Sequence, residues 1–155
     1  MPKNWKFAHA ALVVKDMEKT IKYFKALDVG PFPPFLGGPG MSFTGKTVRG
    51  KPSDYDMDLR LARGNIGGIG IELIQPLKGK SIYNEFLEEK GEGLHHLAFV
   101  VDDIDAEIAD MEKRGFKVVQ TGAMPNTRWA YLEAEDSGGM VIELCQVPGG
   151  QAHKV

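Results

Sequence analysis

The hydrophobic and polar positions of the chain predict short strands interrupted by three helices. Short apolar or alternating runs bounded by turn-forming residues indicate strands, and apolar residues three or four positions apart indicate helices. The predicted strands are residues 7–14, 54–64, 69–77, 93–101, 116–122, 127–136 and 139–147. The predicted helices are residues 17–27, 81–91 and 104–115, and Asp16 and Asp103 are N-capping residues of the first and third.

The stretch between the first helix and the second strand has a different composition. Residues 30–53 are rich in glycine and proline and predict a long loop. The strand that follows alternates between Asp54, Asp56 and Asp58 on one face and apolar residues on the other. This alternation predicts a half-buried strand whose aspartates face solvent, with one of them reaching a cavity.

The second half of the chain repeats the first. When His9 is aligned with His96, an offset of 87 residues, six of the sixteen positions in HAALVVKDMEKTIKYF and HLAFVVDDIDAEIADM are identical. An offset of 71 residues aligns Glu72 with Glu143, and IELIQ with IELCQ. The long loop of the first half absorbs the difference between the two offsets.

The repeat predicts the domain organisation. Each copy reads strand–helix–strand–strand–strand, and internal repeats of this kind indicate one structural unit used twice. We therefore predict a single domain over residues 1–155, with a first module at about 5–76, a linker at about 77–92 and a second module at about 93–148.

Composition and charge exclude several classes of function. The 155 residues are 43% hydrophobic and 26% charged, which is sufficient for a packed core. The net charge is -2, so the chain lacks the excess of basic residues that is typical of proteins that bind nucleic acid or membrane surfaces. Cys145 is the only cysteine, which excludes a disulfide framework and a cysteine-based zinc site. Because no apolar run is long enough for a membrane span and no signal peptide is recognisable, the sequence predicts a soluble, cytoplasmic protein.

Glu72 and Glu143 are unusual because each lies in a strand that is apolar on both faces. A bare carboxylate there costs several kcal/mol unless it is paired, protonated or bound to a metal ion. For one isolated glutamate, a strand end that reaches solvent or a basic partner from another element explains the pattern. Two glutamates in matching positions of a repeat favour a shared chemical role.

Two histidines complete this symmetric set. His9 and His96 each open the first strand of a module, whereas His95 has no counterpart and falls on the opposite strand face, which predicts a structural role. Two imidazoles and two carboxylates suit one divalent ion of Zn, Co, Ni, Mn or Fe. Four protein ligands on a six-coordinate ion leave two positions at which substrate oxygens can chelate.

The chain resembles the vicinal oxygen chelate superfamily, which includes glyoxalase I, methylmalonyl-CoA epimerases and the extradiol dioxygenases. The pattern HxAxxVxD opens both modules, and DSGGMVIEL at residues 136–144 matches the closing D-x-x-G-x-x-I/V-E-L of the family. The resemblance implies an α+β fold in which two tandem βαβββ modules form an open, cupped sheet around a metal site. The ligands it implies are His9, Glu72, His96 and Glu143.

Within the superfamily, IELIQPLKGKSIYNEFLEEKGEGLHHLAFVVDDI is most similar to methylmalonyl-CoA epimerases. The resemblance implies that an acyl-CoA or other thioester is chelated and that its α-proton is removed and returned through an enolate. Glu143 is the first implied acid/base. The second acid/base that the resemblance implies is a glutamate early on the second strand of the first module. This chain has no glutamate between Glu18 and Glu72. The nearest carboxylates are Asp54, Asp56 and Asp58, and Asp56 is the candidate.

Two other functions fit the resemblance. A glyoxalase I-type lyase, acting on a thiol–aldehyde adduct, uses metal-bound carboxylates as bases, which suits the His–Glu–His–Glu set. A sequestering protein of the bleomycin-resistance type has the same fold, although such binders typically lack the full metal set. A dioxygenase fits less well because it usually has three protein ligands. The family also implies a small-molecule substrate and a homodimer.

Overall fold

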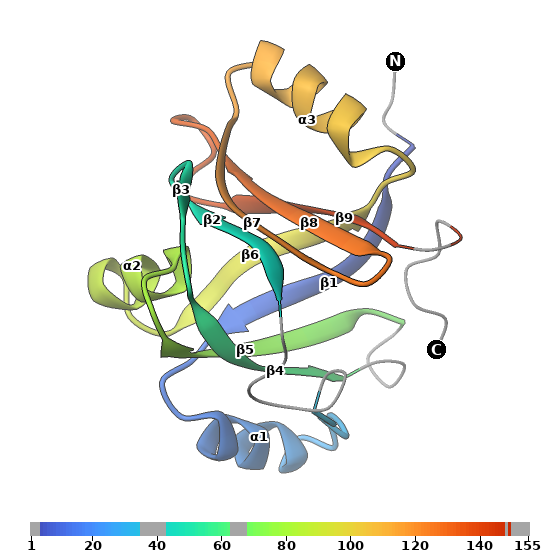
Figure 1. Cartoon of the computed structure of the whole chain (residues 1–155). Helices are drawn as coiled ribbons and strands as arrows, with labels where there is room; N and C mark the ends of the chain where they lie inside the picture. Colours follow the sequence, from blue (N-terminus) through green and yellow to red (C-terminus); the bar gives the residue numbers. More distant parts are fainter. Residues whose placement is uncertain (1–3, 35–42, 63–67, 148, 150–155) are drawn as a thin grey trace. The chain divides into compact units, whose positions relative to one another are not determined.

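Figure 1 shows the helices and strands of the chain, which divides into two units. The computed structural model describes residues 4–34, 43–62, 68–147 and 149. Of these residues, unit 1 comprises 4–8, 43–53, 96–147 and 149, and unit 2 comprises 9–34, 54–62 and 68–95.

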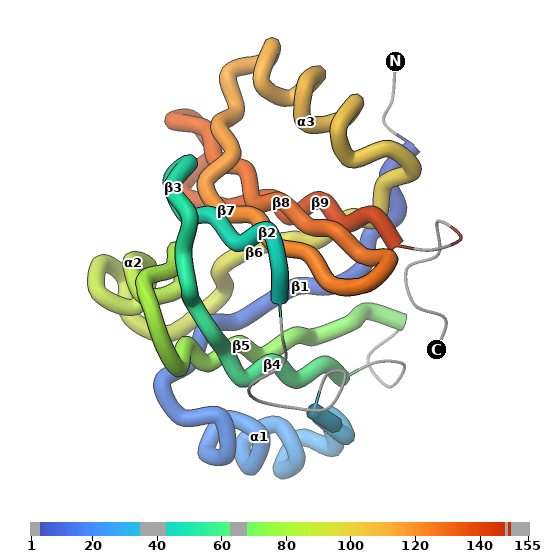
Figure 2. The backbone as a smooth tube through the Cα atoms, in the orientation of Figure 1, coloured from blue at the N-terminus to red at the C-terminus, as the bar shows by residue number. Residues whose placement is uncertain are grey.

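Unit 2 is built on a parallel pair of strands. Most of β1 (Lys6–Val13) pairs in parallel with β5 (Gly70–Lys78), and β4 (Asp56–Ala62) adds antiparallel to β5, in the order β1-β5-β4. The helices α1 (Met17–Lys25) and α2 (Ile82–Glu89) both contact β5. Figure 2 follows the chain from β1 directly into α1. The core of this unit includes Val14, Met17, Ile21, Phe32, Ala62 and Leu73.

Unit 1 repeats this arrangement with additional strands. Most of β6 (Gly93–Val100) pairs in parallel with β9 (Val141–Gln146), which is flanked by β8 (Thr127–Glu133) and then β7 (Lys117–Met124). The short strands β2 (Thr44–Val48) and β3 (Lys51–Pro52) complete the order β3-β2-β7-β8-β9-β6. The helix α3 (Ile104–Lys113) contacts β7, β8 and β9 (Figure 1). Its core includes Val101, Ile104, Met111, Ala130, Leu132 and Leu144.

The predicted α+β class and the repeated element order are confirmed. The elements β1-α1-β2-β4-β5 correspond to β6-α3-β7-β8-β9, and the two-residue β3 and the helix α2 are additions. None of the described helices is long and apolar enough to cross a membrane. The repeat also extends to strand register, because Ala11 lies opposite Glu72 and Ala98 lies opposite Glu143.

The capping residues of α1 and α3 explain where these helices begin. Asp16 accepts a hydrogen bond from the backbone N–H of Lys19, and Asp103 accepts from those of Asp105 and Ala106. An N-cap of this kind satisfies donors that have no partner within the first turn of a helix. The two predicted caps are therefore confirmed, and both helices leave the sheet in the same way.

The predicted loop over residues 30–53 is wrong for its second part. Residues 44–48 form β2 and pair antiparallel with β7, while residues 35–42 lie outside the described part of the chain. The sequence Thr-Gly-Lys-Thr-Val has no apolar alternation, so β2 leaves no periodic signal. Pairing with β7 holds it instead, and the hydroxyls of Thr47 and Thr121 share a hydrogen bond of 2.7 Å.

The predicted solvent-facing row of aspartates is wrong for Asp58, which is buried at 7% exposure, whereas Asp54 is exposed as predicted. Burial along β4 does not alternate, because the neighbouring residues Met57 and Asp58 are both buried, so both faces of the strand are partly covered. Asp58 lies opposite Gln75, and its carboxylate accepts two hydrogen bonds from Arg60, at 2.7 and 2.9 Å. An ion partner within the same strand therefore makes its burial tolerable.

Candidate metal centre

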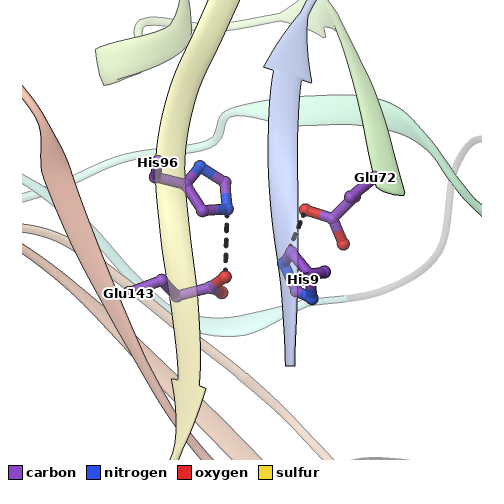
Figure 3. Close-up of side chains that lie close together, drawn as sticks. All are labelled: His9, Glu72, His96 and Glu143. Carbon is purple, nitrogen blue, oxygen red and sulfur yellow. Dashed lines mark ion pairs between the residues drawn. The ribbon is translucent and has the colours of Figure 1, made fainter. Parts of the chain in front are cut away.

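His9 and Glu72 form a buried pair within unit 2 (Figure 3). The parallel register of β1 and β5 places Ala11 opposite Glu72, with His9 two residues earlier on the same face of β1. The Nε2 atom of His9 lies 3.3 Å from Oε2 of Glu72. The two residues are 9% and 4% exposed, so the carboxylate has little access to water.

His96 and Glu143 form the matching pair within unit 1 (Figure 3). Ala98 lies opposite Glu143, with His96 two residues earlier on the same face of β6. The Nε2 atom of His96 lies 3.1 Å from Oε2 of Glu143. His96 is fully buried, and its ring contacts Tyr131 edge-on at a centroid distance of 4.9 Å. Both pairs therefore follow from the same strand register.

Each pair brings together the donor types that bind divalent metal ions. A buried carboxylate costs several kcal/mol unless a cation or hydrogen-bond donor faces it. In each pair the facing group is an imidazole nitrogen, which is a partner when protonated and a fellow ligand when neutral. The residues present thus fit a divalent ion.

Comparison with known proteins supports the resemblance seen in the sequence. The family model of the Glyoxalase/Bleomycin resistance protein/Dioxygenase superfamily matches residues 8–132. The chain belongs to this superfamily.

Its relatives include both characterised and uncharacterised proteins. Mitochondrial methylmalonyl-CoA epimerase from Homo sapiens is 27% identical over 143 residues, which cover 89% of this chain and 72% of the human protein. The uncharacterised protein YqjC from Bacillus subtilis is 30% identical over 89 residues, which span 55% of this chain and 63% of that protein. The crystal structure of methylmalonyl-CoA epimerase from Mycobacterium tuberculosis has the same fold, with a TM-score of 0.65 and 22% identity, covering 91% of this chain and 87% of that one.

The glutamine that ends each repeated IELxQ segment has a structural role in this member of the superfamily. Gln75 accepts a hydrogen bond from the backbone N–H of Met17 at 2.8 Å, and Gln146 accepts from that of Ile104 at 3.1 Å. Because side chains alternate along a strand, a residue three positions after the glutamate falls on the opposite face. In each unit the glutamine therefore links its strand to the start of the helix, while the glutamate lies on the face of the strand that points away from that helix.

The neighbouring histidine, His95, lies in an aromatic cluster of unit 2. Its ring contacts Phe86 at a centroid distance of 5.0 Å and Tyr83 at 5.5 Å, both edge-on. Tyr83 is fully buried, and its ring also contacts that of Tyr55. These contacts agree with the structural role expected for His95.

The structure does not bring Asp56 to the Glu72 pair. Asp56 lies opposite Lys78, six residues along β5 from Glu72, which is roughly 20 Å at about 3.3 Å per residue. Its carboxylate accepts a hydrogen bond from the backbone N–H of Met57. Across from Glu72 itself stands Leu61, so the neighbouring position on β4 is apolar. The register of β4 on β5 could not be read from the alternating sequence.

Three residues outside the predicted ligand set share the face of Glu143: Trp129 and Tyr131, whose shared strand face the sequence already indicates, and Gln120, which the sequence does not single out. Tyr131 lies directly opposite Glu143, Trp129 lies opposite Cys145, and Gln120 lies opposite Tyr131. All three are buried, and Gln120 has no exposed surface. The alternation in TRWAYLE carries this information, but only the pairing of β8 with β9 shows which face it concerns. Unit 1 therefore presents polar and aromatic groups beside its glutamate, where unit 2 presents leucine.

Proposed function

We propose that this protein is a divalent-metal-dependent isomerase of the methylmalonyl-CoA epimerase type. It would remove the α-proton of a chelated acyl-CoA and return it through an enolate. The observation that carries the proposal is the repeated His–Glu pair, one in each unit, with all four residues buried. The epimerases among its relatives, at modest identity, favour a thioester substrate.

The proposal assigns one metal ion to both pairs. His9, Glu72, His96 and Glu143 would hold it, with imidazole nitrogens and carboxylate oxygens as ligands. A bound divalent ion would act as a Lewis acid on the substrate's carbonyl oxygens and so lower the pKa of the α-proton. The burial of all four residues would exclude bulk water from the proton that is transferred.

Proton transfer is assigned to the two buried glutamates. Among the described residues, the buried carboxylates are Asp58, Glu72 and Glu143, and Asp58 is already bound by Arg60. Glu143 would take the proton from one side of the α-carbon. Glu72, the equivalent residue of the other module, replaces Asp56 as the proposed second acid/base, because the strand register places Asp56 far along β4.

A glyoxalase I-type lyase is the second candidate. The observation that favours it is the group of two histidines and two glutamates itself, because such a lyase is expected to use its metal-bound carboxylates as bases. The two candidates differ in substrate, since the lyase needs a thiol–aldehyde adduct. They also differ in product, since the epimerase breaks the C–H bond at the α-carbon and forms it again at the same carbon, with inversion of that centre.

Solvent deuterium incorporation distinguishes these functions. Racemic methylmalonyl-CoA in heavy water should gain one deuterium at the α-carbon, measured by mass spectrometry, faster than in an enzyme-free control. Replacing Glu143→Gln should slow this exchange by about 10²- to 10⁴-fold. The matched control Glu112→Gln, at an exposed position of α3, should exchange at the wild-type rate.

The result that would overturn the epimerase assignment is an absence of exchange in the metal-loaded protein. Turnover of a glutathione hemithioacetal by the same preparation would then support the lyase. Tight binding of a small molecule with no turnover and no metal would support a sequestering protein instead.

Metal stoichiometry tests whether the two pairs share an ion. Elemental analysis of the purified protein should give one divalent ion per chain. Either His9→Ala or His96→Ala should abolish binding, because each removes one ligand of the same ion. Two ions per chain, each lost in only one variant, would show that the pairs are separate sites.

The predicted homodimer and cytoplasmic location belong to the same proposal. Light scattering coupled to size-exclusion chromatography should give twice the chain mass of 17.0 kDa. A mass of one chain would contradict the dimer without affecting the proposed chemistry.

A further inference from the structure

The indole of Trp129 lies on the face of unit 1 that carries Glu143. Trp129 of β8 lies opposite Cys145, which is two residues along β9 from Glu143. Tyr131, two residues along β8, lies opposite Glu143 itself. Because residues two apart on a strand share a face, these side chains all stand on the same face of the sheet. The contact of Tyr131 with the ring of His96 places a second predicted ligand there.

The nitrogen of this indole is a buried hydrogen-bond donor. Trp129 is 6% exposed, and its ring packs edge-on against that of Phe43 at a centroid distance of 5.3 Å. Within the described part of the chain, no group accepts a hydrogen bond from its Nε1–H. A donor that is buried without an acceptor loses its hydration and gains nothing in return, so buried indole N–H groups usually have a partner. The donor therefore points to an acceptor on a bound molecule.

The side chains on either side of Trp129 do not supply that acceptor. Gly122 of β7 lies opposite Trp129 on one side, and Cys145 of β9 lies opposite it on the other. Glycine has no side chain, and cysteine has a short one without oxygen. The neighbouring strands therefore leave the indole N–H to a molecule that binds on this face.

Trp129 is within reach of a small molecule held beside Glu143. The two residues are diagonal neighbours on adjacent antiparallel strands, a relation in which Cα atoms lie about 7–8 Å apart and aromatic side chains can interact. A substrate whose α-carbon lies beside Glu143 therefore brings its α-substituent to the indole when that substituent is longer than a methyl group.

The charges on this face favour a neutral acceptor. Two rows of side chains cross β7, β8 and β9 here, and their described members include no basic residue. The rows are Gln120, Tyr131 and Glu143, and then Gly122, Trp129 and Cys145. Glu143 already places one carboxylate on the face, and a second carboxylate without a cation would be repelled and poorly solvated. An ether, hydroxyl or carbonyl oxygen has no such cost.

The corresponding positions of unit 2 show that the shared fold does not require this indole. Leu61 of β4 lies opposite Glu72, and Leu59 lies opposite Ile74, so Leu59 is the counterpart of Trp129. The same strand arrangement thus forms with an aliphatic side chain at this position. The donor is a feature of unit 1, as expected for a group that recognises one substituent of the substrate.

We propose that Trp129 determines substrate specificity by donating its indole N–H to a neutral oxygen in the α-substituent of the thioester. The inference rests on the proposed function, since it takes the α-carbon to lie beside Glu143. It extends that function by naming the substituent, which is a chain longer than methyl that carries an ether, hydroxyl or carbonyl oxygen.

A matched pair of substrates tests the inference. The α-substituents of (2-methoxyethyl)malonyl-CoA and butylmalonyl-CoA have the same length and differ only by an oxygen in place of a methylene. In the wild type, kcat/KM for deuterium exchange at the α-carbon should be about tenfold higher for the ether, corresponding to about 1.4 kcal/mol. Trp129→Phe should lose this preference, because it keeps an aromatic ring and removes the donor. The control Trp5→Phe removes the other indole N–H of the chain and should keep it.

The variant Trp129→His separates hydrogen bonding from packing. At about pH 8 an ordinary imidazole is neutral and keeps one ring N–H, so this variant should retain part of the preference that Trp129→Phe loses. Equal kcat/KM for the two thioesters in the wild type would overturn the inference. So would a preference that persists in Trp129→Phe, or one in Trp129→His that is no greater than in Trp129→Phe.

A binding measurement separates failure of this inference from failure of the proposed function. The indole ¹H–¹⁵N signals are assigned with Trp5→Phe and followed while (2-methoxyethyl)malonate or butylmalonate is added to the wild-type protein. A saturable downfield shift of the Trp129 indole proton with the ether alone supports the inference even if no thioester exchanges its α-proton. An unchanged signal at millimolar ether would refute it even if methylmalonyl-CoA gains deuterium.

Discussion

The buried ion pair of β4 provides the sharpest test of how unit 2 is held together. Asp58 is 7% exposed, and the side chain of Arg60 is 16% exposed. The guanidinium donates to both carboxylate oxygens, at 2.7 and 2.9 Å, and the hydrogen bond to Asp58 raises the pKa of Arg60. Glu18 of α1 lies 3.7 Å from the same guanidinium but is exposed. Replacing Arg60→Met keeps the packing of the side-chain stem and leaves the Asp58 carboxylate without its cation.

The expected loss follows from the burial of that carboxylate. Breaking a buried ion pair by removing one partner typically costs about 3–5 kcal/mol. Because Arg60 is partly accessible to water, we expect the lower end of this range, about 3 kcal/mol. For a chain of 155 residues this corresponds to a decrease in Tm of roughly 6–12 °C.

Urea denaturation followed by circular dichroism measures this loss. The double variant Asp58→Asn with Arg60→Met should recover at least half of it, because no unpaired charge then stays buried. The single variant Asp58→Asn should still catalyse deuterium incorporation into methylmalonyl-CoA, since Asp58 lies opposite Gln75 and not on the face of Glu72. A loss below about 1 kcal/mol in Arg60→Met, or strictly additive effects in the double variant, would refute the reasoning.

Three further predictions concern the backbone, a surface carboxylate and the metal. Gly79→Ala should destabilise the protein by about 2–5 kcal/mol in urea denaturation, because Gly79 has a φ of +71° and a Cβ there would lie 2.8 Å from the backbone of Tyr55. Gly91→Ala, with a φ of +81° but open space around it, should cost only about 1–2 kcal/mol, and equal losses would contradict the steric argument. The hydrogen bond from Arg128 lowers the pKa of Asp105. The pair therefore stabilises the fold fully at pH values above the ordinary pKa of an aspartate, and this stabilisation is lost as the pH falls through the lowered pKa. Arg128→Gln should therefore return the pKa of Asp105 towards its ordinary value in a carboxyl NMR titration, and an unchanged pKa would exclude this cause. A divalent ion at 100 times its Kd should stabilise the wild type by about 2.7 kcal/mol, reversibly with a chelator. A variant lacking one predicted histidine ligand should show no such shift.

The sequence by itself determined the doubled architecture and the four candidate ligands. Helix caps and apolar periodicity are local signals, so Asp16 and Asp103 correctly mark the starts of α1 and α3. The two alignment offsets matched His9 to His96 and Glu72 to Glu143, and the structure repeats that match in the register of its two parallel strand pairs.

Tertiary structure decided what local periodicity cannot encode. The strand β2 has no apolar face of its own and exists because β7 pairs with it. The antiparallel register of β4 on β5 places Leu61, and not Asp56, opposite Glu72, and Asp58 is buried in spite of its polar character. The neighbours of Glu143 on β8 depend on the pairing of β8 with β9, which the sequence alone does not specify. The physical reason is that strand pairing is satisfied by backbone groups that every residue carries, so its partners and register are fixed only when the whole sheet forms.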